Sequence, residues 1–222
     1  MKNFLAVDTG SKYMTVLVVK DGKKTVVFEP DCAMRHSVKL MHAVDEALKQ
    51  ADCALQELDF FACVVGAGSF TGIRIGISTV KGFALATGKP MLPVTSFDLA
   101  AYNVEEAARG EGGKLLVLSD ALHGAYYACG YGAENRVICP PAYLTEEEAL
   151  VLEKEGYALA SLEPVALKTL VCDPAEGLFK AVTALCAQDK FGELNALYVR
   201  KSQAEINLEA ANAKSGSAEK NA

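Results

Sequence analysis

The sequence predicts an α/β protein made of two duplicated lobes. Short apolar runs typical of buried strands alternate with segments of helical periodicity along the chain. The run Arg-Gly-Glu-Gly-Gly at 109–113 is the clearest linker, and the strand pattern restarts after it. Each half opens with an apolar strand that ends in an aspartate, Asp8 or Asp120, and turns into another strand. We therefore expect a first lobe over residues 1–108 and a second, shortened lobe over 109–206.

The first half is expected to alternate between strands and helices. Asp21-Gly22 is a strong hairpin signal. Leu40, Val44 and Leu48 are spaced by four, as on one face of a helix. Gly88 ends a later helix, and Ser96 can cap another. The expected strands are 4–7, 13–19, 25–28, 60–65 and 91–94, and the expected helices are 37–51, 71–87 and 97–109.

The second half begins with two expected strands, 115–118 and 125–131. Thr145-Glu146-Glu147-Glu148 forms a capping box, so a helix should follow to about Glu155. Asp173-Pro174-Ala175-Glu176 starts another helix that should reach about Asp189, with proline at its first position. Residues 207–222 have nothing apolar to bury, and we expect a disordered tail.

Composition excludes several classes of protein. The 222 residues are 51% hydrophobic, which is enough to bury a substantial core. A net charge of -6 argues against stand-alone binding of nucleic acid, which needs clustered lysine and arginine. Seven scattered cysteines without a C-x-x-C pair indicate a reducing compartment and no zinc site. Without a signal peptide or a long uncharged apolar stretch, we expect a soluble cytoplasmic protein.

The run GAGSFTGIRIG at 66–76 stands between an expected strand and helix, where glycine-rich turns often bind phosphate. It lacks the lysine of a Walker loop, because Ile73 follows Gly72. It is also one residue longer than the dinucleotide fingerprint. The alternative is a structural role, in which Gly68 permits a tight turn while Gly72 and Gly76 allow close backbone approach. From the spacing alone we favour this structural role.

The helix expected at 71–87 is apolar around most of its circumference. Only Arg74, Ser78 and Lys81 form a thin polar stripe on it. Such a helix must be covered on more than one side. One cover is its own sheet, and the other is either a neighbouring helix such as 37–51 or another protein.

Other candidate sites carry less information. Asp8 and Thr9, at a strand end, could hold a metal-bound phosphate, although Asp, Gly and Ser are also ordinary turn residues. His36, His42 and His123 form no H-E-x-x-H motif, which argues against a zinc peptidase.

Three segments together resemble a known family. They are Phe4–Thr9, the run Gly66–Gly76 and Leu197–Glu205, in that order. They are similar to the TsaB (YeaZ) family, bacterial proteins of tRNA threonylcarbamoyladenosine (t6A) synthesis, over about residues 1–206. The resemblance implies the fold of actin, Hsp70 and sugar kinases: two duplicated lobes with mixed sheets flanked by helices.

The resemblance also implies that the chain is not an enzyme. The related transferase TsaD carries a metal-binding His-x-x-x-His shortly after the strand that follows the glycine-turn helix. Ser96 and Ala100 occupy those two places here, so we expect no catalytic residue, no metal and no cofactor. The second-lobe turn Asp120–Tyr127 lacks the arginine and glutamate that family members often have there.

By resemblance, the chain is a scaffold or activator that binds TsaD through its first lobe and helps to recruit the ATPase TsaE. It is expected to be a homodimer when alone, to meet tRNA only through the complex and to bind no membrane. The expected partner-binding residues are Leu40, Met41, Val44, Leu48, Ile73, Arg74, Ile77 and Lys81. The family motif turn comprises Gly66, Gly68, Ser69, Phe70, Thr71, Gly72, Arg74 and Gly76, and Asp8 and Thr9 form a vestigial phosphate loop.

Two enzymatic alternatives remain open. One is a small phosphotransferase or ATPase that uses Asp8, Thr9 and the turn from Gly66 to Gly72 to bind ATP. The other is a metallopeptidase, against which the missing histidine pair counts.

Overall fold

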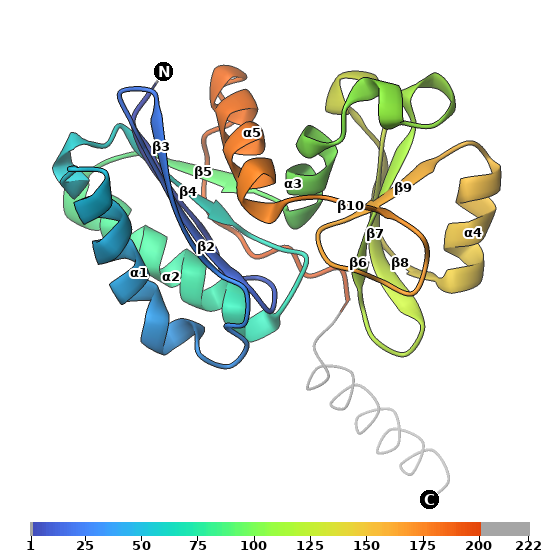
Figure 1. The fold of residues 1–222 in the computed structure, drawn as a ribbon, viewed down its shortest axis with the longest axis horizontal. Helices are drawn as coiled ribbons and strands as arrows, with labels where there is room; N and C mark the ends of the chain where they lie inside the picture. The colour runs from blue at the N-terminus through green and yellow to red at the C-terminus, as the bar shows by residue number, and fades with distance from the viewer. Residues whose placement is uncertain (1, 201–222) are drawn as a thin grey trace, which may run out of the picture.

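The computed structural model describes residues 2–200 and contains two α/β lobes side by side (Figure 1). The tail expected at 207–222, and the end of the motif at 197–205, lie outside the described residues. Within the described part, no helix is both long enough and apolar enough to span a bilayer.

The first lobe is built on a mixed five-stranded sheet of order β3-β2-β1-β4-β5. β2 pairs antiparallel with β1 and β3, whereas β4 runs parallel to β1 and β5. The strands are β1 (Phe4–Asp8), β2 (Met14–Lys20), β3 (Lys23–Glu29), β4 (Phe60–Val64) and β5 (Met91–Val94). All five lie within a few residues of the expected strands.

The second lobe repeats this plan. Its sheet, written in the matching direction, has the order β8-β7-β6-β9-β10, again with two antiparallel and two parallel pairings. The strands are β6 (Leu115–Asp120), β7 (Ala125–Tyr131), β8 (Val137–Thr145), β9 (Ala158–Ser161) and β10 (Leu170–Val171). Strand for strand, the two sheets match, which confirms the duplicated lobes; the sequence pattern had not indicated β8, β9 or β10.

Five helices cover these sheets in layers (Figure 1). α1 (His36–Gln50) and α2 (Phe70–Thr87) lie on the outer face of the first sheet. α3 (Ser96–Asn103) and α5 (Pro174–Ala187) lie between the two sheets. α4 (Glu146–Lys154) covers the outer face of the second sheet.

The position of α5 corrects the expected division into lobes. Leu178 and Val182 of α5 are fully buried in one cluster with Phe4 and Phe60 of the first sheet. α5 follows the linker in sequence but completes the core of the first lobe in space. The boundary expected at residue 108 therefore does not separate two independent packing units.

α3 begins and ends differently from the expectation. Thr95, not Ser96, is the N-cap: its hydroxyl accepts the N–H of Asp98, whose carboxylate in turn accepts the N–H of Thr95. This reciprocal capping box needs an acidic residue three positions after the cap, and only Thr95 has one. The helix ends at Asn103 rather than near Arg109.

The glycine-rich linker is closely packed. The guanidinium of Arg109 is almost fully buried and donates hydrogen bonds to the carbonyls of Ala101 at 2.7 Å and Gly132 at 3.0 Å. A Cβ at Gly110 would lie 1.9 Å from the carbonyl oxygen of Gly156. The linker is thus fixed to the second lobe.

Candidate functional site

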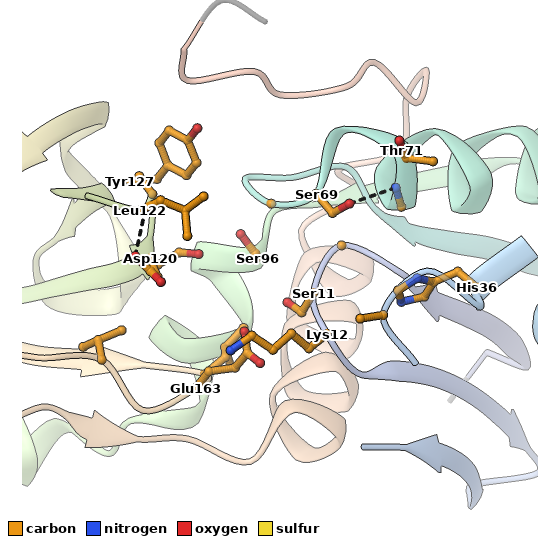
Figure 2. Close-up of a pocket in the computed structure, with 18 of the residues that line it drawn as sticks. Ser11, Lys12, His36, Ser69, Thr71, Ser96, Asp120, Leu122, Tyr127 and Glu163 are labelled. Atoms are coloured by element: carbon orange, nitrogen blue, oxygen red, sulfur yellow. Dashed lines mark hydrogen bonds between the residues drawn. The ribbon is translucent and has the colours of Figure 1, made fainter. Parts of the chain in front are cut away.

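A cleft of about 480 Å³ opens between the two lobes. The first lobe lines it with the turn after β1 and with the N-terminal ends of α1 and α2. The second lobe contributes the turn after β6 and the loop that follows β9. Figure 2 shows side chains from both lobes facing this space.

The glycine turn places the start of α2 directly on the turn after β1. A Cβ at Gly72 would lie 2.0 Å from the Thr9 carbonyl oxygen, and one at Gly68 would lie 2.3 Å from that of Gly10. A Cβ at Gly76 would lie 2.6 Å from the Thr9 hydroxyl. Gly68 also has a φ of 154°, where a side chain is strained. These glycines therefore have the structural role that the spacing favoured: Gly68 permits the tight turn, and Gly72 and Gly76 allow close backbone approach.

Hydrogen bonds connect the two turns further. The Thr9 hydroxyl donates to the carbonyl of Gly72 at 2.7 Å, and the Ser69 N–H donates to the carbonyl of Gly10 at 2.7 Å. Ser69 also caps α2, because its hydroxyl accepts the N–H of Gly72 at 3.2 Å. Thr9 is fully buried, so its hydroxyl is used for packing rather than exposed to a ligand.

Asp8 lies beneath the cleft. Its Oδ1 accepts the N–H of Gly10 at 2.8 Å, and its Oδ2 has no partner among the described residues. Burial raises the pKa of this carboxyl to about 6, while the Gly10 hydrogen bond opposes that rise. The group is 1% exposed and does not line the cleft, so a ligand in the cleft could not reach it directly.

Charged and polar groups of both lobes face each other across the cleft. Lys12 extends from the first lobe toward Glu163, and Asp120 and Tyr127 face the opening from the second (Figure 2). Glu163 had no sequence signal, because it lies in the irregular loop after β9. No cluster of three or more potential metal-ligating side chains occurs within residues 2–200.

Ser96 and Ala100 occupy the two positions at which the family resemblance places the histidine pair of the transferase. The hydroxyl of Ser96 is buried and donates to the carbonyl of Ala67 at 2.7 Å. Ala100 is fully buried against the second-lobe core. Neither an occupied hydroxyl nor a methyl group replaces an imidazole ligand.

Several residues expected at a partner surface lie in the core of the first lobe instead. Leu40, Val44 and Ile73 are buried, and Ile77 is only 8% exposed. Leu48 is half-buried against the same core. Their helical spacing correctly marks the face of each helix that packs on the sheet, and this leaves the four buried side chains no surface for a partner.

Of the expected residues, Met41, Arg74 and Lys81 remain exposed. The structure adds Val38 of α1, 71% exposed, and Leu85 of α2, 89% exposed. Neither residue was among the expected partner-binding residues, although the sequence did indicate that α2 needs cover on more than one side. The available signal was spacing: Leu85 follows Lys81 by four residues and Val38 precedes Met41 by three, so each shares a helix face with an expected residue.

Comparisons with known proteins find that the chain is similar to proteins named for tRNA modification. A family model described as "TsaD: tRNA N6-adenosine threonylcarbamoyltransferase" matches residues 27–171. The tRNA threonylcarbamoyladenosine biosynthesis protein TsaB of Escherichia coli is 31% identical over 152 residues, 68% of this chain and 62% of that protein. TsaB of Bacillus subtilis is 28% identical over 134 residues, 60% of this chain and 57% of that protein. The match thus spans less than two thirds of the length of these relatives.

The solved structure of YeaZ from Pseudomonas aeruginosa has the same fold, with a TM-score of 0.74 and 25% identity. The match covers 89% of this chain and all of that one. The family model, the curated relatives and the solved structure indicate the same family as the motifs in the first lobe do. This chain belongs to the TsaD-related family, in its TsaB (YeaZ) branch.

Proposed function

We propose that this chain is a non-catalytic subunit of bacterial t6A synthesis that docks on a TsaD transferase through α1 and α2. In this role it also helps to recruit the ATPase TsaE, pairs with a second copy when TsaD is absent, and meets tRNA only within the complex. The observation that carries the proposal is the outward face of α2.

That face carries small residues at helical spacing. Ser78, Gly82 and Ala86 are exposed and four residues apart, so they form one line along α2. A Cβ at Gly82 would meet no atom within 4 Å. Small side chains in a line allow another helix to approach closely, and we call Ser78, Gly82 and Ala86 the small-residue line. The exposed Leu85 lies beside it and supplies apolar area that a partner would bury.

The chemistry of the cleft supports a subunit without activity of its own. The places of the metal-binding histidines hold Ser96, whose hydroxyl is already bonded, and the buried Ala100. The Asp8 carboxylate is buried beneath the cleft rather than facing it. The relatives' printed role in tRNA threonylcarbamoyladenosine biosynthesis comes to this chain as part of the proposal.

Gly82→Met tests the proposal with little effect on the monomer. The site is exposed and open, and methionine favours a helix more than glycine does, so the variant should fold at least as stably as the natural chain. Its side chain should block close approach of a helix. We expect a heterodimer of the natural chain with TsaD of the same organism in size exclusion with light scattering, and its loss with G82M.

Leu85→Asp and Val151→Asp form a matched pair for the same assay. Both replace an exposed apolar helix residue, but Val151 lies on α4 of the other lobe. L85D should abolish the heterodimer and V151D should leave it intact. If the natural chain forms no complex with TsaD, with or without TsaE and ATP, the proposed function is wrong.

The second candidate function is ATP binding, and the interlobe cleft of about 480 Å³ is the observation in its favour. Saturable ATP binding in calorimetry, reduced by Lys12→Ala at the cleft wall, would support it. Titration to millimolar ATP without heat of binding would remove it.

A further inference from the structure

Arg74 lies on the outward face of α2, one turn before Ser78. Its guanidinium carbon lies 3.8 Å from the centre of the Phe70 ring, and its Nε donates to the Tyr198 hydroxyl at 2.8 Å. The Phe70 and Tyr198 rings are themselves stacked, with centres 4.5 Å apart. Two aromatic side chains, from α2 and from the C-terminal segment, therefore hold one guanidinium.

The segment that carries Tyr198 is itself fixed. The N–H of Leu197 donates to the carbonyl of Val65 at 2.7 Å. Leu197 and Val199 pack against the second-lobe core, and Arg200 lies 5.2 Å from the Tyr143 ring centre. Tyr198 is therefore held from both sides, and it limits the rotamers open to Arg74.

The two terminal nitrogens of Arg74 are hydrogen-bond donors that remain available to a ligand. Its two terminal nitrogens make no hydrogen bond or ion pair with any other residue of the described chain, 2–200, and the side chain is exposed. A guanidinium presents these nitrogens as a planar fork that fits a carboxylate with two parallel hydrogen bonds. Because the fork is already oriented, less side-chain entropy is lost when it binds.

We infer that Arg74 binds a carboxylate of the protein partner that docks on α2, and that Phe70 and Tyr198 are positioning residues for it. The inference rests on the proposed function and adds the chemistry of one contact. Arg74 continues the small-residue line toward the start of α2, since residues 74, 78, 82 and 86 are each four apart. A protein carboxylate is favoured over a nucleic-acid phosphate because the chain carries a net charge of -6 and would repel a polyanion.

The test measures the affinity for TsaD by calorimetry with four variants. Arg74→Ala should weaken binding about 10- to 100-fold, because a charged hydrogen-bonded pair is lost. Arg74→Lys keeps the charge but not the fork and should weaken it about tenfold. Tyr198→Phe keeps the stack but removes the acceptor of Nε, and a loss of about threefold is expected. Arg136→Ala, an exposed arginine of the second lobe, is the control and should bind like the natural chain.

Salt dependence separates this contact from a purely structural role. Binding of the natural chain should weaken between about 50 mM and about 500 mM NaCl, and R74A should lose part of that dependence. Thermal unfolding of each variant checks that the fold is retained. Equal affinity of R74A and the natural chain overturns the inference while leaving the proposed function intact. If R74K and Y198F bind TsaD as tightly as the natural chain does, the positioning role of Phe70 and Tyr198 is overturned. If the natural chain itself does not bind TsaD, the proposed function is overturned.

Discussion

The two lobes share one sheet plan but differ in what connects the fourth and fifth strands of each sheet. Along the chain of the first lobe, α2 connects β4 to β5. In the second lobe, an irregular loop over 162–169 connects β9 to β10. The second sheet nevertheless has the same strand order. A helix at this place is therefore not needed to form the sheet. What α2 adds is a cover for the turn after β1 and an outward face that the second lobe does not have.

The aspartate turns of the two lobes show the same contrast at atomic scale. Asp8 Oδ1 accepts the N–H of Gly10, and Asp120 Oδ1 accepts the N–H of Leu122, both at 2.8 Å. The local turn is thus the same. Asp8 is buried because the glycine turn packs over it, whereas Asp120 is exposed. Local sequence determines the shape of the turn. The packing of a helix distant in sequence determines whether the aspartate of that turn is buried.

The largest expected effect on stability comes from a substitution that forces α2 away from the turn after β1. Gly72→Val would place a Cβ 2.0 Å from the Thr9 carbonyl oxygen and should destabilise the chain by about 4 kcal/mol or more. Gly82→Ala in the same helix has open space and should stabilise it by up to about 1 kcal/mol. Urea unfolding measures both changes. A small loss for G72V would mean that the contact between α2 and the turn is loose.

A pH series on the two aspartates should give the second largest effect. The folded-state pKa of Asp8 is raised from 3.8 to about 6, so the folded chain holds this proton more tightly than the unfolded chain. That stabilisation is fully present below about pH 4 and is lost as the pH rises through about 6, a change of about 3 kcal/mol.

Asp8→Asn removes this titration and keeps an acceptor for the Gly10 N–H. Its stability relative to the natural chain should therefore rise by about 2 kcal/mol between about pH 4.5 and about pH 7.5 in urea unfolding. Asp120→Asn, at the exposed counterpart, is the control substitution measured beside it. Parallel stability curves for D8N and the natural chain would contradict the assigned burial.

The smallest effect concerns the two capping boxes. Thr145→Ala should cost about 0.5–1 kcal/mol, because its cap at α4 is exposed. Thr95→Ala should cost more, about 1–2 kcal/mol, because its partner Asp98 also accepts the Tyr131 hydroxyl at 2.9 Å and joins α3 to the second sheet. Thermal unfolding of both variants measures the difference, and equal costs would mean that the Tyr131 contact adds nothing.

The sequence predicted the first lobe more completely than the second. The strands of the first lobe are continuous apolar runs, and Asp21-Gly22 does form the turn between β2 and β3. β8 was missed because Pro140 and Pro141 argue against a strand, yet both are tolerated at a sheet edge. β10 has only two residues, too few for any periodic signal.

The candidate surface was less predictable than the fold. Leu40, Val44 and Ile73 were expected at a partner surface, but an apolar helix face does not tell which neighbour covers it. The sheet of the same chain covers these three. Likewise, nothing local in α5 indicates that Leu178 packs on a sheet whose first strand begins at Phe4. Both questions depend on contacts distant in sequence.

The place of α5 has a consequence for the order of synthesis. β1 and β4 are complete once residue 64 has been made, but the helix that covers their inner face ends at Ala187. Until then Phe4, Ala6 and Phe60 lack much of their native cover in the growing chain. The first half to leave the ribosome is therefore among the last parts to finish folding, and a chain stopped at residue 108 would expose an aggregation-prone sheet face.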